Sequence, residues 1–355
     1  MKLSEVFTAK TVASSYTEVA SNKIPYLGSG LFPAKKKMGL DLKWIKGNKG
    51  LPIALAPSTF DAKAKFRDRI GVAKVETEMP FFREGFLVKE VDEQEIMRVV
   101  DSNDPYAKDV LGRIYDDSTN LIDGADVVPE RMIMQLLSPT TGNPGIAIVA
   151  NDVNYTYNYD PDNSFKTSNF MELLTTNKWS DLVVSDPLND LMVAQAAVET
   201  VTGTKPTIAI MSKKTMGYIV KNTKIKASIL AQNSTATIFM TEKRAKSFIL
   251  EELELNIIVY SKQFKDEVGT AKAFYPDDMV TLLPTGALGN TWYGTTPEER
   301  TLLGNTGADV AIVNTGVAVS VSVTTVAPIQ TTTTASEIVL PSFERMSECY
   351  VIKVV

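Results

Sequence analysis

The sequence has no histidine and only one cysteine, Cys349, among its 355 residues. Without histidine, the commonest general base, the Ser-His and Cys-His nucleophile pairs and the usual zinc-ligand sets are excluded. One cysteine cannot form a disulfide within the chain. It lies in an apolar terminal segment, where an inert buried thiol is expected. Most familiar hydrolase mechanisms are thereby excluded. Our prediction for the whole sequence is a protein that is not an enzyme, with no catalytic residue, no metal and no cofactor.

Long apolar runs and a large excess of one charge are also missing. No stretch of about 18 apolar residues is long enough to span a bilayer, and residues 1–20 lack the apolar core of a secretion signal. Hydrophobic residues make up 44% and charged residues 22%, as in folded globular proteins. The net charge of -5 excludes a uniformly basic surface that grips nucleic acid. We expect a folded, soluble protein made in a reducing cytoplasm, without a membrane partner.

Charged residues instead form two adjoining blocks of opposite sign. Residues 35–74 hold eleven basic and three acidic residues, whereas residues 76–131 hold fifteen acidic and six basic ones. Apolar and polar side chains alternate over 40–44, and turn residues at 47–50 precede a second apolar run at 51–55, which predicts a β-hairpin. The hairpin lacks the interleaved aromatic residues of a single-strand nucleic-acid binder. An acidic protein surface is its expected partner.

The acidic block contains the pattern of a long helix. Asp104-Pro105 is a typical helix start, and apolar residues then recur at helical spacing. We predict a break at Gly124 and a helix end at Pro129, with the apolar stripe continuing to the stop signal Ser138-Pro139. A strand is predicted at 145–149.

The middle and the end of the chain differ in pattern. Residues 177–294 alternate helix and strand signals, with a helix from Asp186-Pro187 to Gly203 and two more after the capping residues Ser212 and Thr241. Strands are predicted at 207–211 and 256–260 in this α/β segment. Later strand signals come without intervening helices, at 317–324, 331–334, 338–340 and 350–355.

No string of the sequence carries a complete catalytic or ligand-binding motif. The glycine-rich string 286–291 lacks the third glycine of a dinucleotide fingerprint, and Asp277-Asp278 lacks the spaced oxygens of a calcium loop. Both are typical of turns. An enzyme that uses carboxylates on carbohydrates or nucleotides remains an alternative. So does a β-rich adhesin, which the threonine-rich end favours and the missing secretion signal disfavours.

Five strings do resemble a known family. They read LFPAKK and MGLDLKWIKG within 31–47, PSTFDA at 57–62, MPFFRE at 79–84, and FYPDDMVTLLPTGALGNT at 274–291. In this order they are similar to strings of the tailed-bacteriophage major capsid proteins related to the lambda E protein. The resemblance spans nearly the whole chain, and its specificity lies in length and order rather than in chemistry.

The resemblance implies an α+β fold, the HK97-type capsid fold. Its parts would be an N-terminal arm (1–34), an extended hairpin or E-loop (35–80), a peripheral domain with a long spine helix (81–176), an axial α/β domain (177–324), and C-terminal strands that return to the peripheral domain (325–355).

The resemblance also implies the function of a major capsid protein of a tailed phage or prophage. Copies of the chain would assemble in the bacterial host cytoplasm, through pentamers and hexamers, into an icosahedral virion shell around double-stranded DNA that is bound without sequence specificity. A separate scaffolding protein is expected because the sequence starts directly at the arm. A portal and an optional decoration protein are further partners. The lysine-asparagine crosslink of the HK97 protein is not expected. An encapsulin-like cellular compartment shell is the alternative within this fold.

We predict that the basic hairpin packs over the acidic helix of an adjacent subunit. We also predict that the turn-rich end of the axial domain exposes an aromatic pair at a symmetric contact. The candidate inter-subunit residues are Lys35, Lys36, Lys37, Lys43, Trp44, Lys46, Lys49, Arg67, Arg69, Trp292 and Tyr293.

Overall fold

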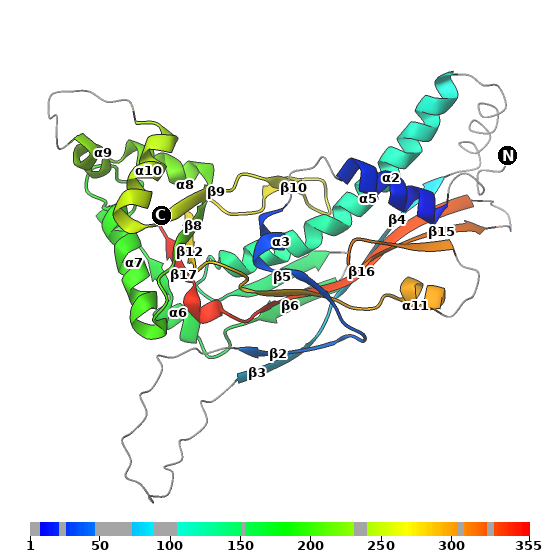
Figure 1. Cartoon of the computed structure of the whole chain (residues 1–355), viewed down its shortest axis with the longest axis horizontal. Helices are drawn as coiled ribbons and strands as arrows, with labels where there is room; N and C mark the ends of the chain where they lie inside the picture. Colours follow the sequence, from blue (N-terminus) through cyan, green and yellow to red (C-terminus); the bar gives the residue numbers. More distant parts are fainter. Residues whose placement is uncertain are drawn as a thin grey trace, which may run out of the picture. The chain divides into compact units, whose positions relative to one another are not determined.

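The chain forms two compact units, each with its own sheet (Figure 1). The computed structural model describes residues 8–20, 26–46, 73–88, 105–150, 153–230, 240–303, 309–324 and 330–355. Unit 1 comprises Met1–Lys43, Glu76–Met132 and Gly289–Ser342, and unit 2 comprises Trp44–Val75, Ile133–Leu288 and Phe343–Val355. Among the described residues, no helix is both long enough and apolar enough to cross a membrane.

Unit 1 is built on a six-stranded sheet of order β1-β13-β16-β15-β14, in which β4 also pairs with β16. The long strand β16 pairs antiparallel with β15 on one side and β4 on the other, so the separate strand signals at 331–334 and 338–340 belong to one strand. The strands are β1 (Ala34–Lys36), β4 (Phe81–Val88), β13 (Gly289–Tyr293), β14 (Asp309–Val313), β15 (Val317–Thr324) and β16 (Gln330–Phe343).

Helix α2 (Ala9–Ala20) covers β14 and β15 in unit 1. Ala9, Val12 and Tyr16 recur at helical spacing and are buried in one cluster with Val319 and Ile122. Part of the predicted N-terminal arm therefore belongs to the core of its own chain. Of these three residues only Tyr16 is large, and the small side chains of Ala9 and Val12 suffice for close packing of the helix on the sheet.

Helix α5 (Pro105–Leu137) runs through both positions where a break or an end was predicted. Gly124 is exposed, where a glycine costs a helix only about 1 kcal/mol. Pro129 lies inside the helix and is buried, as are Met132 and Leu136 beyond it. The burial of this last segment outweighs the loss of about 3 kcal/mol that proline causes in a helix. The helix ends before Ser138-Pro139, as predicted.

Unit 2 contains a five-stranded sheet of order β7-β17-β12-β8-β9. The predicted strands at 207–211 and 256–260 are confirmed as two adjacent parallel strands. The strands are β7 (Phe170–Glu172), β8 (Ile208–Met211), β9 (Asn256–Val259), β12 (Met279–Leu283) and β17 (Tyr350–Lys353).

Four helices pack with this sheet around one apolar cluster. They are α7 (Pro187–Thr202), α8 (Lys213–Lys221), α9 (Thr223–Leu230) and α10 (Glu242–Leu253). The predicted caps are confirmed: Asp186 accepts from the Asn189 amide at 3.2 Å, and Ser212 and Thr241 accept equivalent bonds. Gly203 ends α7 with φ 70°, a conformation that glycine adopts without strain.

Shorter elements complete the two units. The pairs are β5 (Gly145–Ala150) with β6 (Val153–Asn158), β10 (Gln263–Lys265) with β11 (Ala271–Ala273), and β2 (Asp41–Lys46) with β3 (Ala73–Glu78). The remaining helices are α3 (Leu27–Leu31), α6 (Ser164–Ser168), η1 (Thr175–Asn177), α11 (Pro297–Leu303) and η2 (Met346–Glu348). The predicted return strand at 51–55 lies outside the described residues, and β2 pairs with β3.

The boundaries of the two compact units differ from the boundaries of the predicted segments. Strands β13, β14 and β15 were expected in the axial segment (177–324), but they share the sheet of β16 in unit 1. Strand β17, expected to return to the peripheral domain, pairs with β12 in unit 2. A sequence pattern identifies a strand without identifying its partner, because the partner is set by contacts distant in the chain.

Candidate assembly surfaces

The first basic residues of the predicted hairpin lie on strand β1. This strand pairs parallel with β13, so that Lys35 is opposite Trp292 and Lys36 is opposite Tyr293. The Lys35 ammonium nitrogen is 5.5 Å from the centre of the Trp292 ring, within cation-π range. The structure thus brings two of the predicted site residues together within one chain.

Lys36 and Lys37 also have contacts within their own chain. The Lys36 ammonium forms an ion pair of 2.6 Å with Glu299, in the first turn of α11. The Lys37 ammonium donates to the backbone carbonyl of Asp41 at 2.6 Å. All three lysines keep part of their surface in water, so their charge is available to a second molecule.

The other hairpin residues fall into three groups. The Trp44 side chain is 6% exposed, and its ring centroid lies 5.3 Å from that of Tyr159. It is already packed inside its own chain. Lys43 is exposed on β2, and Lys46 is the last residue of that strand. Lys49, Arg67 and Arg69 lie outside the described residues.

The aromatic pair at the end of the middle segment lies on strand β13, not on a loop. Tyr293 is buried, and burial raises the pKa of its phenol, with the Glu337 carboxylate as a second cause. Trp292 is half-buried, and its Nε1 donates to the Ser342 hydroxyl at 3.0 Å. The loop interpretation was wrong because the turn residues Pro284, Gly286 and Gly294 flank a short strand whose partners are far away in the sequence.

Sequence reasoning missed the acidic residues that face this basic segment. Glu298 and Glu299 begin α11, and Glu298 pairs with Arg83 and accepts from the Ser336 hydroxyl at 2.7 Å. The available signal was Pro297 followed by two glutamates, which is typical of a helix start. These acids orient the basic side chains of β1 and β4.

A second missed residue is Glu337, on β16. Its side chain is 1% exposed, and neither carboxylate oxygen has a hydrogen-bond partner among the described residues. Burial raises its pKa well above the ordinary value, and the charge of Asp126 acts in the same direction. No sequence pattern distinguished this glutamate from a solvated one.

The described residues offer charged surfaces for contact. Within them, no group of three or more acidic or cysteine side chains is placed to hold a metal ion. The Cys349 thiol is buried, and burial raises its pKa. What the geometry provides is exposed basic side chains on both strands, Lys35 and Lys36 on β1 and Lys43 on β2.

The chain matches one family model, described as phage major capsid protein E, over residues 8–335. A comparison with curated proteins finds no match. Among solved structures, the putative capsid protein of an Escherichia coli prophage has a TM-score of 0.60 and 15% identity, covering 98% of this chain and 99% of that chain. A phage-related protein from Bordetella bronchiseptica has a TM-score of 0.55 and 13% identity, covering 98% and 96%.

At these identities the structural likeness shows the fold, which is the mixed helix and sheet architecture of the HK97-type capsid proteins. The family match favours a phage capsid protein over the encapsulin-like alternative, and the family is a structural one. The chain belongs to the phage major capsid protein E family.

Proposed function

We propose that copies of this chain assemble through pentamers and hexamers into the icosahedral shell of a tailed phage or prophage, enclosing double-stranded DNA. Beyond the family match, the ribbon of β2 and β3 carries this proposal. It forms a sheet of only two strands among the described residues, and such a ribbon is marginal in water by itself. Leu42 and Trp44 pack one face of the ribbon inside its own chain, and a neighbouring subunit covers the opposite face, on which Lys43 is exposed.

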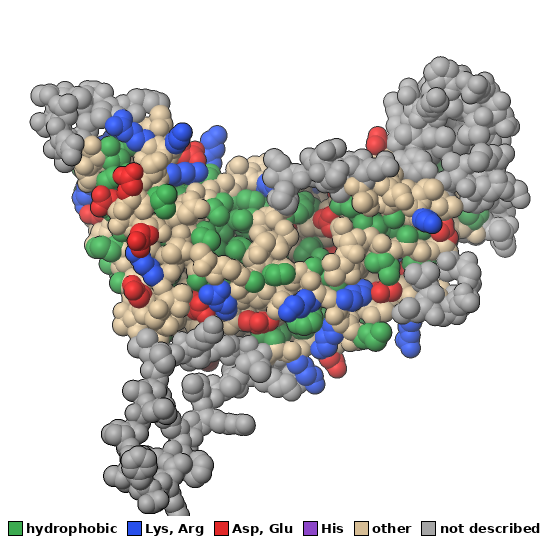
Figure 2. Space-filling model, in the orientation of Figure 1, with side chains coloured by type: hydrophobic (Ala, Val, Ile, Leu, Met, Phe, Trp, Pro, Cys, Tyr) green, Lys and Arg blue, Asp and Glu red, His purple; other side chains and the backbone are tan. Residues whose placement is uncertain are grey.

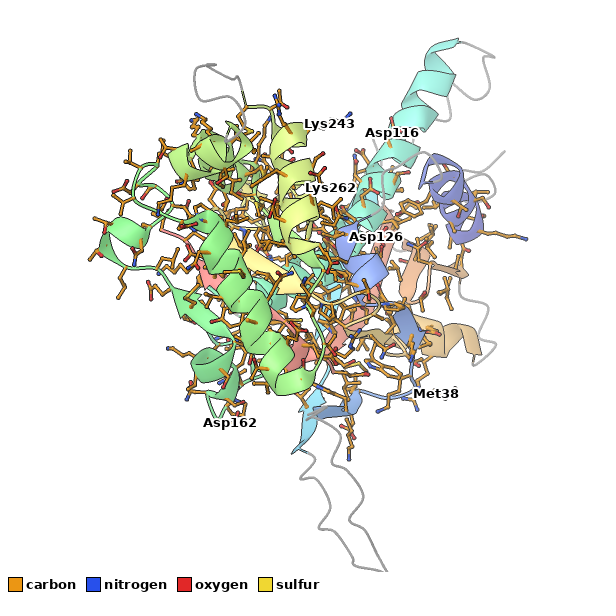
Figure 3. The ribbon with its side chains drawn as sticks, turned by 60° about the vertical axis from the view of Figure 1, so that its left-hand side comes forward. Met38, Asp116, Asp126, Asp162, Lys243 and Lys262 are labelled. Atoms are coloured by element: carbon orange, nitrogen blue, oxygen red, sulfur yellow. The ribbon has the colours of Figure 1, made fainter. Side chains whose placement is uncertain are left out.

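The acidic helix α5 of the adjacent copy is the proposed partner of the ribbon. Asp116 and Asp117 are exposed on this helix, and Figure 3 labels Asp116 on it. The basic block that begins at Lys35 has the opposite charge. Complementary charges accelerate encounter and fix the register of two surfaces more than they increase affinity.

Other partners follow from the proposed function. A separate scaffolding protein sets the shell geometry, a portal occupies one vertex, and a decoration protein is an optional addition. Assembly takes place in the bacterial cytoplasm, and the product is the virion, in which the chain is structural and not catalytic. The net charge of -5 suits a DNA container, because a strongly basic lining would hinder movement of the packaged polymer.

Charge reversal tests the ribbon contact. We expect the triple variant Lys35→Glu, Lys36→Glu, Lys37→Glu to need a higher protein concentration for half-assembly, most clearly at low salt. Adding Asp116→Lys and Asp117→Lys to this variant should recover part of the loss. Sedimentation across salt concentrations measures both effects.

A matched control separates the contact between subunits from the local ion pair. The double variant Lys36→Glu with Glu299→Lys restores an ion pair inside the chain while still reversing Lys36. Wild-type assembly by the triple variant at every salt concentration would contradict the electrostatic contact.

A further inference from the structure

The first turn of α11 joins two strands of unit 1 by charge. Glu299 pairs with Lys36 on β1 at 2.6 Å, and Glu298 pairs with Arg83 on β4. The two oxygens of Glu298 have different partners, since Oε1 faces the guanidinium and Oε2 accepts from the Ser336 hydroxyl of β16 at 2.7 Å. Figure 2 shows basic and acidic side chains next to each other beside the place of α11 in Figure 1. The chain thus supplies carboxylates to its own basic strands.

The two glutamates are held more firmly than the cations they contact. Their side chains are 14% and 12% exposed, against 46% for Arg83 and 30% for Lys36. The buried hydroxyl of Thr296 accepts from the Glu299 amide at 3.2 Å and so caps the turn that carries both acids. Lysine and arginine have long side chains whose charged ends reach into water. The cations can therefore turn toward a second molecule while the carboxylates stay in place.

Other basic residues of the same segment keep their full charge. Lys35 lies over the Trp292 ring, and Lys37 donates to a backbone carbonyl, so these contacts neutralise neither ammonium group. Lys36 and Arg83, in contrast, each face a carboxylate. The surface therefore attracts an acidic partner with part of its charge, while α11 cancels the rest.

A carboxylate of the same chain competes with one from another copy for the same cation. An intramolecular partner has a high effective concentration, so a neighbouring copy must displace it. Displacement is feasible because ion pairs that stay in contact with water contribute little stability. The Phe81 ring, 4.8 Å from the Arg83 guanidinium carbon, keeps this cation at the surface during the exchange. The acids of α11 thus lower the charge that an approaching copy meets.

We propose that the first turn of α11 restrains assembly. In the free chain its two glutamates neutralise Lys36 and Arg83, and in the shell carboxylates from helix α5 of an adjacent copy replace them. The restraint slows the first encounter most, because charge complementarity acts chiefly on association. The inference rests on the proposed shell function and adds a means of regulating it.

Removing the two acids tests the restraint in the full chain. Glu298→Gln with Glu299→Gln keeps the size of both side chains and frees both cations, so half-assembly should need a protein concentration lower by about threefold or more at low salt. The matched control is Glu251→Gln with Glu252→Gln, which changes the net charge equally at two exposed positions of α10. The control should assemble as wild type. Sedimentation and electron microscopy measure both variants.

Two further measurements separate a restraint from a purely structural role. The melting temperature of the unassembled Glu298→Gln, Glu299→Gln chain should stay close to that of wild type, because the ion pairs are partly exposed. Weaker or unchanged assembly by this variant would overturn the proposal. So would a reconstruction of the wild-type shell in which both ion pairs persist, a result that does not depend on the folding of any variant. If neither the wild-type chain nor the α10 control formed shells, the proposed function itself would be contradicted instead.

Discussion

Lys35 places its ammonium nitrogen 5.5 Å from the centre of the Trp292 ring, across the parallel pair of strands β1 and β13. The same indole donates from Nε1 to the Ser342 hydroxyl at 3.0 Å. The contact therefore joins the start of the basic segment to the sheet of unit 1. Both residues stabilise one chain, whatever role they also have between subunits.

Substitutions at these two positions should differ in their effect on stability. Lys35→Gln removes only the cation-π contact and should lower the free energy of unfolding by about 0.5–1 kcal/mol. Trp292→Asp also removes the half-buried ring and its hydrogen bond, and should cost about 2–3 kcal/mol. Urea unfolding of the unassembled chain measures both. Equal losses for the two variants would contradict the role given to the indole.

Glu337 should make stability depend on pH. Its pKa in the folded chain is raised by burial above the ordinary value of 4.5. Stability from the protonated form is therefore fully present below about pH 4.5 and is lost as pH rises toward the raised folded-state pKa. We expect Glu337→Gln to remove this decline, so that the variant gains stability over wild type as pH increases.

Unfolding curves recorded from pH 4.5 upward measure this difference. Glu84→Gln is the matched control, because Glu84 is exposed on β4, which pairs with the strand that carries Glu337. Its pH profile should remain parallel to that of wild type. A profile for Glu337→Gln that also stays parallel would show that the buried carboxyl does not titrate between the folded and unfolded states.

Local signals in the sequence predicted much of the secondary structure, and contacts between distant segments set the rest. The caps at Asp186, Ser212 and Thr241 act within one helical turn, so their residue types are sufficient evidence. Pro129 misled the prediction of α5, because burial of the helix beyond it outweighs the local penalty. Trp292 was assigned to a loop because its strand partners β1 and β16 lie far away in the chain.

The sequence also predicted only part of the candidate site: its lysines were identified, and the acidic residues near them were not. The cluster of lysines at 35–37 is visible in composition, and all three were named. Their acidic counterpart Glu299 comes from a helix that the sequence reading did not single out, and the ion pair with Lys36 depends on the fold of unit 1. Glu337 was missed because burial is a tertiary property, which a glutamate in a strand pattern does not reveal.

Gly289 should not tolerate any side chain. A Cβ atom at this position would lie 1.8 Å from the backbone carbonyl oxygen of Ser342, which cannot rotate away as a side chain does. We expect Gly289→Ala to lower the free energy of unfolding by about 1–3 kcal/mol or more. Gly217→Ala in α8 is the control, because nothing lies within 4 Å of the added methyl group. It should stabilise the helix by up to about 1 kcal/mol, and thermal melting that ranks the two variants in the opposite order would contradict the close approach.

Cys349 should be unreactive in the folded chain. Its side chain is 1% exposed, and burial raises the pKa of the thiol, so little thiolate forms at neutral pH. We expect a disulfide reagent such as Ellman's reagent to label the urea-unfolded chain completely while the native chain remains unlabelled over the same time. Fast labelling of the native chain would show that the terminal segment opens readily.

An electron cryomicroscopy reconstruction of the particles that the full chain forms would test the proposed shell directly. We expect closed icosahedral shells in which unit 2 surrounds the five-fold and six-fold axes and the β2–β3 ribbon lies over a neighbouring subunit. A chain that stays monomeric at high concentration, or a shell with the ribbon at the axes and unit 2 at the outer edge of each capsomer, would contradict it.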